Sequence, residues 1–140
     1  MNIAVFASHG GSDLQAIIDG CKQDRLNATV AVVISNNSDS MALERAKREN
    51  IPAYHMSVKK YGGEDLLAKE LLGVLEEHQI DMIFLAGYMR MLHADILTRY
   101  HNRVFNIHPA LLPKFGGKGM YGMNVHTAVI AAKEKETGVT

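Results

Sequence analysis

Short apolar runs that alternate with stretches of helical periodicity constrain the fold of this chain most strongly. The runs show almost no alternation with polar residues, which is typical of strands buried on both faces of a sheet. The stretches between them space apolar residues as a helix does, and Leu14, Ile17, Ile18 and Cys21 form one such stripe. The pattern predicts an α/β fold, an open parallel, Rossmann-like sheet with helices on both faces.

The same pattern predicts where the elements lie along the 140 residues. We expect strands over residues 3–7, 29–34, 52–56, 82–86 and 104–108. We expect helices over residues 14–21, 39–49, 64–78 and 93–100, and a last helix from residue 125 to near 135. No repeat or linker divides the chain, which is therefore predicted to be a single domain over residues 1–140. Residues 137–140 begin a further strand, so we expect the domain to be incomplete at its C-terminal end.

The composition excludes several classes of protein. Fifteen basic side chains balance fifteen acidic ones, and this zero formal charge argues against nucleic-acid binding. The single Cys21 excludes an internal disulfide and favours a reducing, cytoplasmic setting. No basic residue precedes Lys22, so no secretory signal is expected, and no apolar run approaches the roughly 18 residues that cross a membrane. The seven histidines show no metal-ligand spacing, so no metal site is expected.

Residues 8–13 follow the first predicted strand, at the sheet edge where ligands of open parallel sheets bind. Two glycines allow a tight turn, and Ser12 offers a hydroxyl at a helix start, which together are typical of a phosphate cradle. An ordinary glycine turn with Ser12 or Asp13 as the helix N-cap explains the residues equally well. A dinucleotide site is disfavoured, because the spacing G-x-G-x-x-G is absent.

Residues 86–92 follow the fourth predicted strand and set Arg90 among apolar side chains. This mixture suits a flat, partly polar ligand whose carboxylate or carbonyl would bind the guanidinium group. From the residues alone, a loop whose Met and Leu side chains cap the core is the better explanation.

Asn106 and His108 lie at the end of the fifth predicted strand, where alternation puts them on one face about 7 Å apart. An amide and an imidazole that converge on one point form a proton donor and an oxyanion-binding group. A buried Asn and His that satisfy loop carbonyls is the alternative. Their position at the carboxyl end of a strand favours the functional interpretation.

Three segments, residues 8–13, 85–92 and 106–115, resemble in order and spacing the phosphoribosylglycinamide formyltransferase family, folate-dependent enzymes of purine biosynthesis. The related methionyl-tRNA formyltransferases share the Asn-x-His element, but we expect an Arg-rich loop after Leu112-Pro113 in those enzymes. Here residues 114–122 read KFGGKGMYG, which is similar to the purine enzyme.

The resemblance implies transfer of a formyl group from 10-formyltetrahydrofolate to the amine of glycinamide ribonucleotide, without a metal or a covalent enzyme intermediate. It assigns Gly11, Ser12 and Asp13 to the substrate phosphate. It implies that Asn106, which also contacts the folate, and His108 are catalytic. Four residues would border the folate pterin: Met89, Arg90, Met91 and Leu92.

The chain departs from the family at His9, where Gly is usual, at Asp13, where Asn is usual, and at Glu64, where some relatives carry Arg. In the family, a later loop carries an Asp that charges and orients the catalytic His. Without it we expect His108 to be less protonated, and residues 1–140 alone to have little activity and to self-associate. Two alternatives stay open: another 10-formyltetrahydrofolate-dependent transferase or hydrolase, and a non-catalytic remnant that binds phosphate or folate.

Overall fold

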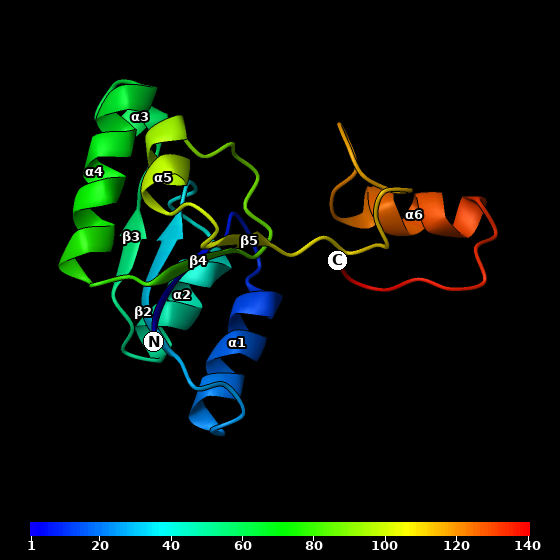
Figure 1. Ribbon diagram of the computed structural model, residues 1–140, viewed down its shortest axis with the longest axis horizontal. Helices are drawn as coiled ribbons and strands as arrows, with labels where there is room; N and C mark the ends of the chain where they lie inside the picture. The colour runs from blue at the N-terminus through cyan, green and yellow to red at the C-terminus, as the bar shows by residue number, and fades with distance from the viewer. The chain divides into compact units, whose positions relative to one another are not determined.

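The computed structural model describes residues 1–140, which form two compact units, Met1–Phe105 and Asn106–Thr140 (Figure 1). The single domain expected over residues 1–140 stays a prediction.

A sheet of five strands in the order β3-β2-β1-β4-β5 is the framework of the chain. The strands are β1 (Asn2–Phe6), β2 (Thr29–Ser35), β3 (Ala53–His55), β4 (Met82–Leu85) and β5 (Val104–Asn106). The pairs β1–β2, β1–β4 and β2–β3 are parallel. The predicted α/β fold with a parallel sheet is confirmed, and every predicted strand is present within one or two residues of its expected ends.

Six helices accompany the sheet: α1 (Ser12–Lys22), α2 (Met41–Arg48), α3 (Val58–Tyr61), α4 (Glu64–Glu77), α5 (Ala94–Arg99) and α6 (Met123–Ala131). The sequence pattern did not predict α3, because four residues are too few to show helical periodicity. Its local signals are an N-cap at Ser57, whose hydroxyl accepts a hydrogen bond from Lys60 N, and a left-handed Gly62 at its end. The longest helix, α4, has 14 residues, and no helix is both long and apolar enough to span a membrane.

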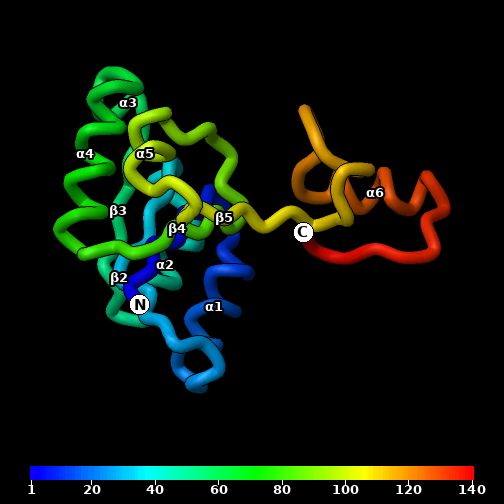
Figure 2. The backbone as a smooth tube through the Cα atoms, in the orientation of Figure 1, coloured from blue at the N-terminus to red at the C-terminus, as the bar shows by residue number.

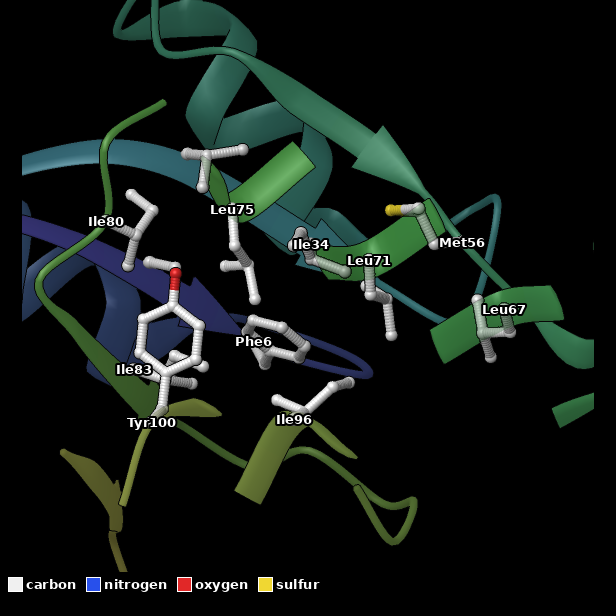
Figure 3. Close-up of a cluster of buried hydrophobic side chains, with 12 residues drawn as sticks. Phe6, Ile34, Met56, Leu67, Leu71, Leu75, Ile80, Ile83, Ile96 and Tyr100 are labelled. Carbon is white, nitrogen blue, oxygen red and sulfur yellow. The ribbon is translucent and has the colours of Figure 1, made fainter. Parts of the chain in front are cut away.

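Alternate residues of the central strands pack against helices on opposite faces of the sheet. Phe6, Ile34 and Ile83 join one buried cluster with Leu75 of α4 and Ile96 of α5, which Figure 3 shows as a continuous layer of side chains. The residues next to them in β1 and β2 point to the opposite face and are buried too. On that face, α1 and α2 lie against β2, on the side of the sheet away from α4 (Figure 1). Burial on both faces explains why these strands lack polar alternation.

The unit Asn106–Thr140 has a small core of its own, in which Ala110 packs with Val125 and Val129 of α6. Figure 2 traces its backbone into α6 and back to the C-terminal residue, which lies beside His108. The N–H of each of these two residues donates to the carbonyl of the other, at 2.8 and 2.9 Å.

Two sequence predictions for this unit are wrong. Residues 137–140 form no strand, because their backbone pairing with the chain after β5 is limited to the two hydrogen bonds between His108 and Thr140. The last helix ends at Ala131 rather than near residue 135, because Lys133 adopts a left-handed conformation with φ 53°.

The core of the first unit supplies a stability test. Replacing Leu75, which is fully buried, with Ala should lower the free energy of unfolding by about 2–5 kcal/mol, because the lost methyl groups leave a cavity. Leu66→Ala, in the same helix but 55% exposed, should change it by no more than about 0.5 kcal/mol. Urea unfolding measures both, and equal effects would contradict this assignment of the buried face.

Candidate active site

The loop between β1 and α1 has the geometry of an anion-binding turn. Gly11 is the N-cap of α1 with φ 70° and ψ 32°, a left-handed conformation that glycine adopts without strain. A Cβ atom at Gly11 would lie 3.0 Å from Ala42 of α2, so the loop also needs glycine for its close approach to that helix. The first hydrogen bond of α1 runs from Gln15 N to Gly11 O at 3.0 Å. The N–H groups of the turn before Gln15 are therefore free to bind an anion.

Neither Ser12 nor Asp13 is the N-cap of α1, so the alternative of an ordinary side-chain-capped turn is wrong. The chain places the cap one residue earlier, at Gly11, and no side chain bonds to the first turn. Both residues are exposed, and Asp13 brings a negative charge into that turn. Without a capping bond, its carboxylate is close to where an anion would bind.

Ser8 joins this loop to its two neighbours. Its side chain is fully buried, and its hydroxyl donates to Asn36 Oδ1 at 2.5 Å and accepts from Met89 N at 2.8 Å. Its carbonyl accepts from Asn37 Nδ2 at 2.7 Å, and its N–H donates to Gly87 O at 3.1 Å. Because these partners follow β2 and β4, one residue holds together the ends of three adjacent strands.

A cavity of about 440 Å³ opens within the unit Met1–Phe105, beside the segment that follows β4. This volume and the mixture of apolar and polar walls fit a drug-sized organic ligand. The lining residues are Asn36, Ser57, Val58, Glu64, Leu67, Ala68, Leu71, Tyr88, Arg90, Met91, Leu92, His93 and Ala94.

Three of the four residues assigned to the folate, Arg90, Met91 and Leu92, line this cavity, and Met89 does not. Met89 instead uses its backbone N–H to bind Ser8. The alternative was that the Met and Leu side chains of this segment cap the core. Leu92 does pack on the core, but Met91 is 92% exposed and does not.

The polar groups of the cavity are held in defined states. Burial raises the pKa of the Tyr88 hydroxyl, an effect that the charge of Arg90 opposes and that of Glu64 reinforces. Tyr88 therefore stays protonated at neutral pH and is a hydrogen-bond donor. His93 Nδ1 accepts from Asp95 N at 3.3 Å, so Nε2 carries the proton that it donates to Asp65, 3.1 Å away.

Asn106 and His108 belong to the second unit. β5 ends at Asn106, two residues before the predicted end, and the N–H of His108 donates to Thr140 O rather than to the sheet. His108 is half-buried, and its Nε2 lies 2.7 Å from Phe115 O, so this nitrogen carries a proton. The alternative interpretation was a buried Asn and a buried His that satisfy loop carbonyls. It describes His108, but it does not describe Asn106, which is exposed.

Sequence reasoning missed several polar residues of the cavity. Asn36 directly follows β2 and Ser57 comes two residues after β3, and their position at the carboxyl edge of the sheet was the available signal. Tyr88 lies within residues 86–92 and His93 directly follows them, but the pattern of that segment pointed to Arg90 and its apolar neighbours. No group of three or more His, Cys, Asp or Glu side chains is placed to hold a metal ion.

Two adjacent glycines give a matched test of the loop. Gly11→Ala should cost about 1–3 kcal/mol of stability, because alanine is strained at a positive φ and its Cβ would press on Ala42. Gly10→Ala should change stability by less than about 1 kcal/mol, because nothing lies within 4 Å of its Cβ position. Thermal or urea unfolding compares them, and a larger loss at Gly10 would show that the loop has a different conformation.

The family described as formyl transferase matches residues 1–140 of the chain. The chain is 37% identical, over 139 residues, to the chloroplastic phosphoribosylglycinamide formyltransferase of Arabidopsis thaliana, with 99% of this chain and 48% of that protein covered. It is 35% identical over 140 residues to phosphoribosylglycinamide formyltransferase of Escherichia coli (strain K12), with 100% of this chain and 64% of that protein covered.

The crystal structure of glycinamide ribonucleotide transformylase 1 from Symbiobacterium toebii superimposes with a TM-score of 0.90 at 38% identity, covering 100% of this chain and 64% of that one. The chain thus spans about half the length of the plant relative and under two thirds of the bacterial ones. The plant relative is named as chloroplastic, and the cytoplasmic setting of this chain stays a prediction. Because the family match runs from the first residue to the last, the chain belongs to the formyl transferase family.

Proposed function

We propose that the protein containing this chain transfers a formyl group from 10-formyltetrahydrofolate to the amine of glycinamide ribonucleotide, a step of purine biosynthesis. The observation that carries the proposal is the similarity over 99–100% of the chain to two proteins named phosphoribosylglycinamide formyltransferase. The anion-binding turn and the cavity support it, because the two substrates are a phosphate ester and a flat, partly polar molecule.

The turn at Gly11, Ser12 and Asp13 is the proposed phosphate subsite. Its support is the set of backbone N–H groups that precede the first hydrogen bond of α1, at the positive end of the helix dipole. Backbone donors are present whatever side chains the turn carries, and a charged side chain such as Asp13 changes the affinity of the site.

The cavity is the proposed folate subsite, bordered by residues 89–92. Arg90 is a cation that suits a carboxylate or carbonyl of the ligand, and the apolar walls suit a flat ring. Met89 belongs to this subsite through its backbone, since its bond to Ser8 fixes where the segment begins.

Asn106 and His108 are the proposed catalytic residues. The amine nitrogen attacks the formyl carbon and forms a new C–N bond, and a negative charge develops on the formyl oxygen. The Asn106 amide donates a hydrogen bond to that oxygen, and His108 as imidazolium stabilises it. The C–N bond to the folate then breaks, and the leaving nitrogen gains a proton while the attacking nitrogen loses one. Because Nε2 of His108 is bonded to Phe115 O, Nδ1 is the ring atom proposed to act.

The assay that tests the function offers 10-formyltetrahydrofolate with three acceptors: glycinamide ribonucleotide, charged initiator tRNA and water. The complete gene product that contains this chain is used. We expect formyl transfer to glycinamide ribonucleotide only. Transfer to the tRNA would show that the protein is a different transferase. Release of formate would show that it is a hydrolase, and no reaction at all would show that it is a binding protein.

Substitution of the catalytic pair tests the residue roles. Asn106→Ala and His108→Ala should each lower kcat by about 100-fold or more, because each removes a donor to the developing oxyanion. His126→Ala is the matched control, since this imidazole is exposed in the same unit and should leave kcat unchanged. If His108→Ala keeps most of the rate, its catalytic assignment is wrong.

Asp13 gives a test of the phosphate subsite. Asp13→Asn should lower the KM for glycinamide ribonucleotide about twofold to fivefold, because it removes a negative charge that repels the phosphate. The KM for the folate should not change. Asp24→Asn makes the same charge change beyond the other end of α1, at a left-handed position that Asn tolerates, and should have no effect. An unchanged KM in Asp13→Asn would place the phosphate elsewhere.

A further inference from the structure

Arg45 of α2 is hydrogen-bonded to the loop of the proposed phosphate subsite. Its Nε donates to Gly10 O at 2.8 Å, and its Nη1 donates to Gln15 Oε1 at 3.2 Å. Gln15 is the residue whose N–H closes the first turn of α1 on Gly11. One guanidinium group therefore bonds both the residue before the turn and the residue that ends it.

This contact also sets the direction of a donor. In a planar trans peptide the C=O of one residue and the N–H of the next point in opposite directions. By holding Gly10 O, Arg45 directs the Gly11 N–H away from itself, and that N–H donates to no backbone carbonyl. The arginine thus holds a free donor of the turn in a direction away from its own guanidinium group.

The charge of Arg45 is not neutralised by an ion pair. The side chain is half-buried, and both of its hydrogen-bond acceptors are uncharged oxygens. The ion pairs formed by neighbouring residues, Lys47 with Glu44 and Lys22 with Glu49, do not include it. Its two bonds use Nε and Nη1, so Nη2 keeps its N–H donors for another partner.

We propose that Arg45 is a positioning residue of the phosphate subsite, which fixes the Gly10–Gly11 peptide and supplies the positive charge that offsets Asp13. This inference rests on the proposed function, because that function places a phosphate at the turn. A cation that holds the loop serves a dianionic ligand in two ways: it orients backbone donors, and it lowers the electrostatic cost of bringing the phosphate next to a carboxylate.

The test compares two ligands by calorimetry, glycinamide ribonucleotide and the riboside that lacks its phosphate. Arg45→Met should weaken binding of the ribonucleotide about tenfold or more and leave binding of the riboside unchanged, since the missing charge acts on the phosphate alone. Arg48→Met removes the same charge one turn further along α2, from an exposed side chain, and should change neither affinity more than about twofold.

Arg45→Lys separates the two parts of the role. Lysine keeps the charge but loses the planar fork that bonds Gly10 and Gln15 together, so we expect an affinity for the ribonucleotide between those of the unchanged protein and Arg45→Met. If Arg45→Met fails to fold, the affinity of Arg45→Lys for the ribonucleotide is measured instead. An affinity equal to that of the unchanged protein would then show that the two hydrogen bonds of the guanidinium group have no role in phosphate binding.

Three outcomes contradict the inference in distinguishable ways. Equal weakening of both ligands by Arg45→Met would show a merely structural contact. An unchanged affinity for the ribonucleotide would show that Arg45 has no role in phosphate binding. If the unchanged protein binds the ribonucleotide no more tightly than the riboside, the proposed phosphate subsite itself is wrong, and the inference falls with it.

Discussion

The burial of β1 on both faces and its pairing at both edges is the constraint on which the rest of the first unit depends. Residues 3–6 are at most 2% exposed, with β2 on one side and β4 on the other. A shift of one residue would exchange the side chains of the two faces, and the pairing of residues 3–6 with β4 is regular, although the pairing with β2 shifts between Ile3 and Ala4. The burial and pairing of β1 therefore determine where the strand ends and where Ser8 lies, and the residues of the loop do not.

Ser8 carries this fixed position into the candidate site. A fully buried hydroxyl is costly without partners, and the partners available to Ser8 lie on the chain that follows β2 and on the chain that follows β4. The anion-binding turn begins next to Ser8, and Met89, which Ser8 binds, lies between Tyr88 and Arg90, which line the cavity. Both proposed subsites of this unit are thus placed by the same strand end, which explains how loops with few contacts of their own can hold defined positions.

Much of this arrangement could be predicted from the sequence, because it depends on local pattern. The two-sided strands and the glycine turn that contains Gly11 follow from spacing and residue type, whereas residues 89–92 are assigned to the folate only by the family resemblance. The contacts that could not be predicted join residues far apart in the chain: Ser8 with Met89, Arg45 with Gly10, and His108 with Thr140. β5 ends two residues earlier than predicted, and the backbone of His108 pairs with Thr140 instead, a contact that no local pattern indicates.

The two proposed subsites differ in what their chemistry requires of the sequence. At the turn, the proposed ligands of the phosphate are backbone N–H groups, so exposed side chains such as Asp13 would only tune the affinity. Gly11 is required by its conformation and by the nearness of Ala42. In the cavity, the groups that line the proposed subsite are side chains such as Arg90 and Tyr88, so each replacement there would alter the ligand that fits. On this proposal, the cation of Arg45 offsets the charge of Asp13, and this chain would keep the same ligand at the turn although its side chain there is an acid.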